Sequence, residues 1–275
     1  MRSSRAVVGV VLGVVALPGL LAGVEAVSFH VRNRSNGVLI SSGLEREYLL
    51  HVPQSLDRTR RVPLVVSQHG GAMWPAAQME TSRWNRLADA LGFIVVYPSA
   101  VAGRGPRVWH ADGGPGQARD VRYISDLIDT LTARFDIDST RIYANGLSNG
   151  GGMTFALSCE LSDRIAAFGM VAPALFLSWS GCAGRPPVPL IAFHGTGDPA
   201  VPYRGGRSWV APNSLPDIER WVARFAERNR CTAGPADSAV ARDVSRRTFS
   251  GCADEATVVL YTIAGGGHTW PGGGP

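Results

Sequence analysis

The 275-residue sequence predicts an α/β fold in which helices cover both faces of a mostly parallel sheet. Apolar strands alternate along the chain with segments of helical periodicity, which is the pattern of parallel strands joined by helical crossovers. Residues able to carry out chemistry follow directly after several of these strands, at the edge where such sheets bind ligands. Hydrophobic residues make up 45% of the chain and charged residues 18%, which is typical of a globular domain and not of a disordered chain.

The expected elements follow from their periodicity, taken in chain order. The first strand alternates, the second is a continuous β-branched run and the later ones are short apolar runs; we expect them at 44–52, Val62–Gln68, 93–97, 141–144, 166–171, 188–193 and Val258–Ile263. The segment 120–135 repeats apolar residues at helical spacing and is the clearest helix. Further helices are expected at 81–91, 149–161 and 215–228.

The first 26 residues have the pattern of a signal peptide. Arg2 and Arg5 precede an uncharged run at 6–24, and Ala26 follows at the position that a signal peptidase reads. An uncleaved anchor is the alternative, because the run is almost long enough to span a bilayer, but Pro18 breaks its helix near the cleavage end. We therefore expect a signal peptide at 1–26, a catalytic domain at 27–275, and a secreted or periplasmic protein that leaves the membrane after cleavage.

The four cysteines fall in two pairs that are local in sequence. In an exported protein an even number of cysteines indicates disulfides, and three connectivities are open. The local one is favoured because each bridge closes a short loop: Cys159 with Cys182, and Cys231 with Cys252. A metal site is the alternative, but the chain has no C-x-x-C pair and no histidine at ligand spacing, so we expect no metal.

The charge distribution argues against a nucleic-acid partner. The net charge is +5, yet the basic residues are scattered and form no basic helix face. We expect a monomer whose partner is a small or polymeric substrate.

One glycine-rich motif points to a nucleophile. Gly146-Leu147-Ser148-Asn149-Gly150 fits G-x-S-x-G, follows the strand at 141–144 and opens a helix, as a nucleophile elbow requires. The glycines are needed because side chains in so sharp a turn would collide with neighbouring backbone. The alternative is a glycine-rich turn with a capping serine.

The serine needs a base and an orienting acid, which follow it in the order acid, then histidine, in α/β hydrolases. His268 follows the strand Val258–Ile263 and a triple-glycine turn, so we predict it as the base. Asp198 follows the strand at 188–193 and is predicted to orient the imidazole. His194 is the other histidine after Ser148, and we expect it to be structural.

The oxyanion of such a reaction needs two hydrogen-bond donors. The backbone N–H of Asn149, directly after the nucleophile, is expected to be one. The loop after Val62–Gln68 should supply the second, with Gly71 as the first choice and Ala72 as the next. His69 and Gly70 are expected to shape that loop.

Together these motifs carry a family resemblance. His69-Gly70-Gly71, 146–150, 192–203 and 266–272 resemble the polyhydroxybutyrate-depolymerase/LpqC-type esterases, which are related to the feruloyl and acetylxylan esterases of carbohydrate esterase family 1. The resemblance covers nearly the whole chain after the leader. It implies the α/β-hydrolase fold and hydrolysis of carboxylic esters through an acyl-serine, without a metal or organic cofactor, by secreted enzymes. Paired cysteines also fit this family.

Three questions stay open at this point. Trp74, Trp109 and Trp270 lie near the predicted site, where they would either bind substrate or pack under loops. Family members continue past the histidine loop into a final helix, whereas this chain stops at Pro275; either that loop has less support or the sequence is incomplete. An acyltransferase using the same triad and a catalytically weak binding protein are the rival functions.

Overall fold

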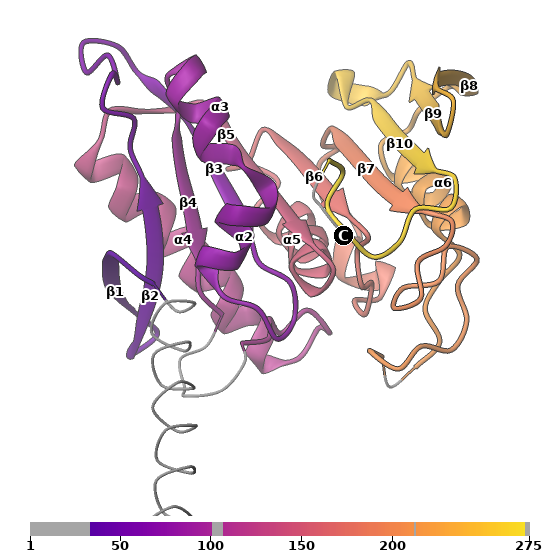
Figure 1. Cartoon of the computed structure of the whole chain (residues 1–275), viewed down its shortest axis with the longest axis horizontal. Helices are drawn as coiled ribbons and strands as arrows, with labels where there is room; N and C mark the ends of the chain where they lie inside the picture. The colour runs from indigo at the N-terminus through magenta and orange to yellow at the C-terminus, as the bar shows by residue number, and fades with distance from the viewer. Residues whose placement is uncertain (1–33, 101–106, 212, 273–275) are drawn as a thin grey trace, which may run out of the picture. The chain divides into compact units, whose positions relative to one another are not determined.

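The computed structural model describes residues 34–100, 107–211 and 213–272. These residues form one ten-stranded sheet with helices on both faces (Figure 1). The strand order is β1-β2-β4-β3-β5-β6-β7-β10-β9-β8, and the six strands from β4 to β10 in this order run parallel. The predicted α/β class with a mostly parallel sheet is confirmed. The leader expected at 1–26 lies outside the described residues.

The elements have the following bounds. The strands are β1 (Gly37–Ser41), β2 (Leu44–His51), β3 (Val62–Gln68), β4 (Ile94–Pro98), β5 (Ile137–Leu147), β6 (Ala167–Val171), β7 (Leu190–Gly195), β8 (Ala233–Ala241), β9 (Val244–Ser250) and β10 (Val258–Ile263). The helices are α2 (Pro75–Ser82), α3 (Trp84–Leu91), α4 (Pro115–Arg134), α5 (Asn149–Glu160) and α6 (Ile218–Arg228), with single 3₁₀ turns at Trp179–Cys182 and Ala253–Glu255.

Two apolar clusters hold the helices to the two faces of the sheet. The larger one joins α4, α5 and α6 to one face, and its centre contains Phe155, Trp221 and Phe225 in edge-on and tilted aromatic contacts. The smaller one joins α2 and α3 to the other face through Met79 and Ala88. The helices thereby bury one face of the parallel strands and, on the other face, β3 and β4, as continuous apolar strand sequences require. On that second face Ile191 of β7 is 39% exposed and lines an open groove with Trp84.

Several elements differ from the sequence-based expectation. The helix expected at 81–91 is two helices, because Arg83 adopts a left-handed conformation with φ of 56° and ends α2 before α3 begins. Helix α4 begins at Pro115, five residues early, with proline in the first turn where its missing N–H costs nothing. The edge strand β1 and the hairpin of β8 and β9 were not expected.

Both local disulfides are present in the structure. Cys159, in α5, is bonded to Cys182, and Cys231 is bonded to Cys252. The bridges close loops with sequence separations of 23 and 21 residues. Within the described ranges, no helix combines the length and apolar character needed to cross a membrane.

Candidate active site

The predicted triad residues lie after three strands that share one edge of the sheet. Strands β5, β7 and β10 are parallel members of the run β5-β6-β7-β10, so their carboxyl ends lie on the same side (Figure 1). Ser148 directly follows β5, Asp198 lies three residues after β7, and His268 is in the loop after β10. The fold therefore brings all three loops to the edge where open α/β sheets bind ligands.

Ser148 occupies a strained turn between β5 and α5. Its φ of 57° and ψ of −119° lie outside the regions that non-glycine residues normally adopt. The strain is held by three backbone hydrogen bonds: Ser148 N–H donates to Val171 O, and Ser148 O accepts from the N–H groups of Gly152 and Ala174, each at 2.9 Å. This is the strand-turn-helix geometry of a nucleophile elbow.

The glycines of the elbow make room for backbone. A methyl group on Gly146 would collide with the carbonyl of Gly150, and one on Gly150 would collide with the carbonyls of Gln68 and His69. Neither position tolerates a side chain without movement of the main chain, so the two glycines permit close approach of β5, α5 and the loop after β3.

Asp198 is a buried carboxylate, and both of its oxygens accept hydrogen bonds. Its Oδ1 accepts the N–H groups of Ala200 at 2.9 Å and Val201 at 2.8 Å, and its Oδ2 accepts His268 Nδ1–H at 2.8 Å. Burial alone raises the pKa of Asp198, but the hydrogen bonds from His268 and the two backbone groups outweigh burial and hold the pKa below its usual value. The group is therefore ionised at neutral pH.

His268 is oriented by Asp198 and remains partly accessible. Its side chain is 22% exposed, whereas the Asp198 carboxylate is fully buried. Since Nδ1 donates to the carboxylate, the neutral ring carries its proton there and presents an unprotonated Nε2. Among the described residues no hydrogen bond joins this ring to the Ser148 hydroxyl, a contact that often tightens only when substrate binds.

His194 lies on the other side of the same carboxylate. Its Nε2–H donates to Val201 O at 2.8 Å and is 3.4 Å from Asp198 Oδ2. The side chain is fully buried, and burial lowers its pKa, so the imidazole is neutral. His194 thus contacts both Val201 and Asp198 and does not reach solvent.

The two predicted oxyanion donors belong to peptide groups whose carbonyls are fixed. Gly70 O accepts from His69 Nδ1 at 2.7 Å and from Met73 N–H at 3.3 Å, and because the peptide is planar and trans, the Gly71 N–H points the opposite way. Ser148 O accepts the N–H of Gly152 in α5. Because this peptide is also planar and trans, the N–H of Asn149 points in the opposite direction, away from the helix. As the first helical residue, Asn149 has an N–H outside the helical ladder.

The two candidate donors lie close together, one in the loop after β3 and the other at the first residue of α5. A methyl group built on Gly71 would be 3.4 Å from Asn149 Cβ, and one on Gly70 would be 3.6 Å from Ser148 Cβ. Ala72, the second choice from sequence, does not qualify because its N–H donates to Arg107 O at 2.9 Å. Gly71 therefore stays the candidate for the second donor.

His69 begins the loop after β3 and is a buried, neutral imidazole. Its Nε2 accepts the N–H of Ala100 at 3.1 Å, which leaves the ring proton on Nδ1 for the bond to Gly70 O. Burial, aided by the nearby charge of Arg107, lowers the pKa of His69 to about 4. The ring therefore keeps this tautomer at neutral pH.

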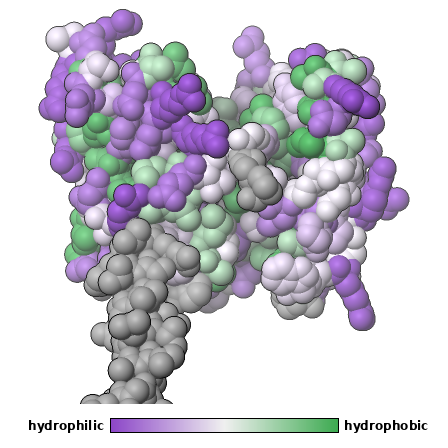
Figure 2. Space-filling view, viewed as in Figure 1, coloured by the Kyte–Doolittle hydropathy of each residue, from purple (hydrophilic) through white to green (hydrophobic). Residues whose placement is uncertain are grey.

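The three tryptophans predicted near the site have different surroundings. Trp270 lines a groove of about 340 Å³ together with Pro271, Phe193 and residues of α3, and the surface is hollowed on this face (Figure 2). Trp74 is half-buried at the start of α2. For Trp109 the structure shows the second of the two alternatives, packing: the residue is 2% exposed, stacks on Tyr123 in the core and donates its indole N–H to His69 O.

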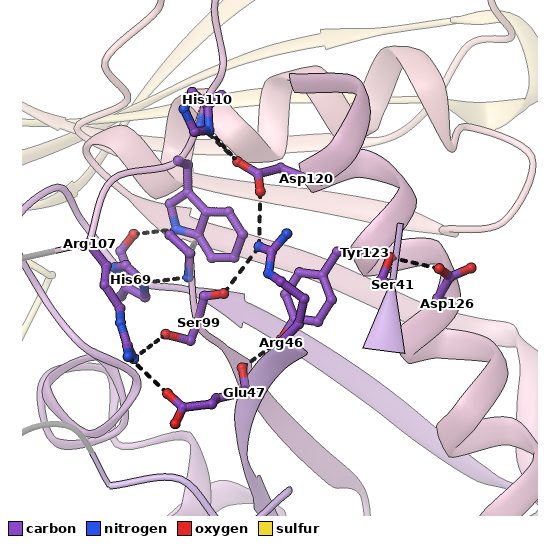
Figure 3. Close-up of polar contacts among 12 residues, drawn as sticks. Ser41, Arg46, Glu47, His69, Ser99, Arg107, His110, Asp120, Tyr123 and Asp126 are labelled. Atoms are coloured by element: carbon purple, nitrogen blue, oxygen red, sulfur yellow. Dashed lines mark hydrogen bonds and ion pairs between the residues drawn. The ribbon is translucent and has the colours of Figure 1, made fainter. Parts of the chain in front are cut away.

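The buried polar network of Arg46, Asp120, Arg107 and Glu47 was not predicted from the sequence. Arg46 pairs with Asp120 at 2.9 Å, and both side chains are essentially fully buried. Arg107 pairs with Glu47 at 2.9 Å (Figure 3). A clue was available in the arginine at an otherwise inward-facing position of β2, but its partner on α4 is 74 residues away.

The fold and the arrangement at its sheet edge define the chain as an α/β hydrolase. The acetyl xylan esterase from Aspergillus awamori superposes with a TM-score of 0.65 at 17% sequence identity, covering 82% of this chain and 90% of that chain. Residues 46–182 match the family model described as Esterase PHB depolymerase. The putative esterase NocK from Nocardia uniformis subsp. tsuyamanensis is 31% identical over an alignment of 261 residues, and the match covers 86% of this chain and 73% of the relative. The chain belongs to the PHB-depolymerase esterase family.

Other relatives are larger proteins. Feruloyl esterase B from Piromyces equi is 30% identical over 81% of this chain, and the bifunctional acetylxylan esterase/xylanase XynS20E from Neocallimastix patriciarum is 32% identical over 59%. The matched regions are 42% and 23% of those two proteins, so the chain spans less than half the length of either.

Proposed function

We propose that the protein is a serine esterase that cleaves carboxylic esters through an acyl-enzyme on Ser148. The observation that carries this proposal is the buried Asp198 carboxylate holding His268 at 2.8 Å, on the same sheet edge as a strained serine elbow. A hydroxyl is a weak nucleophile without a base, and an imidazole with a free Nε2 is the base that it requires. Family membership supports the same reaction.

In the proposed reaction His268 Nε2 takes the Ser148 proton as the hydroxyl attacks the ester carbonyl. Asp198 stays ionised, keeps the ring in the correct tautomer and stabilises the imidazolium. The N–H groups of Gly71 and Asn149 stabilise the negative oxygen of the tetrahedral intermediate, each contributing roughly 3 kcal/mol. The imidazolium then protonates the leaving alcohol, and water repeats the sequence to release the acid.

The substrate class is proposed from the relatives and the groove. Relatives carry the names feruloyl esterase and acetylxylan esterase, and Trp270, two residues after His268 in the chain, lines an apolar groove. A hydroxycinnamoyl or short acyl ester on a polysaccharide fits this arrangement, since an aromatic acyl group packs well against an indole. Hydroxybutyrate esters are the second substrate class in the proposal.

We further propose that the protein is exported and acts as a monomer. The two disulfides support an oxidising compartment, and the apolar leader supports export with cleavage near residue 26. No metal or organic cofactor is needed for the proposed chemistry.

A substrate panel tests the function. Purified protein should hydrolyse short p-nitrophenyl esters and at least one of methyl ferulate, acetylated xylan or hydroxybutyrate oligomers. The variant Ser148→Ala should lower kcat on the same substrates by roughly 10⁴-fold or more while keeping the wild-type unfolding temperature. A folded Ser148→Ala variant that keeps its activity would reject the proposal. Added alcohol acceptors would reveal acyl transfer as transesterified product.

A further inference from the structure

Residues 107–110 are here called the strap. They bind both ends of the loop 69–72, here called the oxyanion loop because it carries the proposed donor Gly71. Arg107 O accepts the N–H of Ala72 at 2.9 Å, just after the two glycines. The indole N–H of Trp109 donates to His69 O at 3.0 Å, just before them. The loop that presents the first predicted donor is thus fixed at its two ends by one short segment.

The same tryptophan also holds the residue that carries the second donor. Trp109 N–H donates to Asn149 Oδ1 at 2.7 Å, and Asn149 Nδ2 donates to Trp109 O at 3.0 Å. Both ends of the Asn149 amide are therefore occupied by the backbone of a single residue. The bonds are buried, so water does not compete with them.

The strap itself is anchored to the body of the fold at each end (Figure 3). The Arg107 side chain, 4% exposed, pairs with Glu47 on β2 at 2.9 Å. At the other end, the N–H and Nδ1 of His110 bond to Asp120 Oδ2 at 2.9 and 3.0 Å, and Asp120 is also paired with Arg46. Because both of its ends are anchored, the strap fixes the positions of the oxyanion loop and of Asn149 relative to each other.

We propose that Trp109 is a positioning residue that sets the separation between the Gly71 and Asn149 N–H groups. The inference rests on the proposed function. Because Trp109 is buried, it acts on the tetrahedral intermediate only through the two segments that it joins, the loop after β3 and the start of α5. Oxyanion stabilisation depends on donors 2.7–3.1 Å from the developing charge, and a misplacement of about 1 Å can lower a rate about 100-fold.

The test compares Trp109→Phe with Trp221→Phe on an ester and a matched thionoester. Trp109→Phe removes the indole N–H bond to His69 O and leaves the ring in the core. The control, Trp221→Phe, makes the same substitution in α6, where Trp221 is buried against Phe155 of α5 and Phe225. Sulfur accepts hydrogen bonds weakly, so thionoester hydrolysis gains less from an oxyanion hole.

We expect Trp109→Phe to lower kcat for the ester by about 10- to 100-fold, with KM changed less than about twofold. The ratio of ester to thionoester kcat should fall in this variant and stay at the wild-type value in Trp221→Phe. Asn149→Ala removes the two hydrogen bonds between the Asn149 amide and the Trp109 backbone, and it should also lower the ratio of ester to thionoester kcat. This variant tests the proposal if Trp109→Phe fails to fold.

Folded variants of Trp109 and Asn149 with the wild-type ratio would overturn the positioning role, even if their rates are lower. That outcome leaves the proposed function intact, because wild-type hydrolysis is measured in parallel. A wild-type protein inactive on both esters would overturn the proposed function and the inference together.

Discussion

Asp198 has two histidine neighbours, and their hydrogen bonds assign them different roles. His268 is partly exposed and uses Nδ1 on the carboxylate, which leaves Nε2 for a substrate-side proton. His194 is fully buried and donates its N–H to Val201 O. In the proposed reaction the proton therefore passes between Ser148 and the leaving group through His268, because a general base must be able to reach the proton that it takes.

This difference predicts the outcome of two matched substitutions. His268→Gln should lower kcat/KM by roughly 10⁴-fold, because the serine loses its base, whereas His194→Gln should cost far less. Asp198→Asn should resemble His268→Gln, since an amide favours the wrong tautomer. Kinetics on variants shown to be folded decide the question. An inactive His194→Gln beside an active His268→Gln would overturn the triad assignment.

The buried His69 predicts a pH dependence of stability. The unfolded chain protonates this histidine near pH 6.5, whereas burial lowers its folded-state pKa to about 4. Between these values the unfolded state binds more protons, so the stability contribution is present above pH 6.5 and is lost as pH falls toward 4, by about 3 kcal/mol.

The variant His69→Asn removes this titration while its amide can still donate to Gly70 O. We expect the free energy of unfolding, measured with urea at pH 7, 5.5 and 4, to fall less steeply with acid in the variant than in the wild type. Parallel pH dependences for the two proteins would show that His69 is not protonated differently on unfolding.

At the scale of elements, the elbow is the most constrained segment. A methyl group on Gly152 would collide with Ala174 O, and one on Gly150 with the carbonyls at the end of β3 and the start of the following loop. We expect Gly150→Ala and Gly152→Ala to lower the free energy of unfolding by about 1–3 kcal/mol or more and to reduce activity, because the backbone around Ser148 must move.

Gly184→Ala is the control for the elbow variants, since its added methyl group meets no atom within 4 Å and only its φ of 71° opposes the change. Thermal unfolding and esterase assays of the three variants provide the comparison. Elbow variants as stable and active as Gly184→Ala would contradict the packing described for the turn.

The elements that the sequence predicted are those whose burial is patterned. Strand β3 and helix α4 carry apolar residues at the period of their structure, and both were expected. Strand β8 was missed because all nine of its residues are exposed, so no apolar alternation marks it; it is held by pairing with β9, including the Asp237–Arg247 ion pair. The break at Arg83 was also missed, because arginine carries no helix-ending signal.

The same distinction applies to the candidate site. Ser148, Asp198 and His268 were predicted because each follows a strand in a recognisable motif, and the sheet topology places their loops at one edge. The role inferred for Trp109 was not predictable, because its partners His69 and Asn149 are 40 residues away on either side in sequence. Only tertiary packing brings them together.

At the scale of the whole molecule, the two disulfides make stability depend on an oxidising compartment, where they form and persist. Each closes a loop of about 20 residues and should contribute about 3 kcal/mol, mainly by restricting the unfolded chain. Peptide mapping of non-reduced, exported protein should link Cys159 to Cys182 and Cys231 to Cys252. Reduction should lower the unfolding temperature by several degrees. Four free thiols in exported protein would contradict the proposed oxidising compartment.

The central claim is that Ser148 is a nucleophile activated by His268, and covalent labelling tests it most directly. A fluorophosphonate reacts only with an activated serine, so mass spectrometry should find one adduct per chain, on the peptide that contains Ser148. His268→Gln should label far more slowly, and Ser148→Ala should not label at all. An adduct on another residue, or protein that hydrolyses esters yet stays unlabelled at Ser148, would contradict the claim.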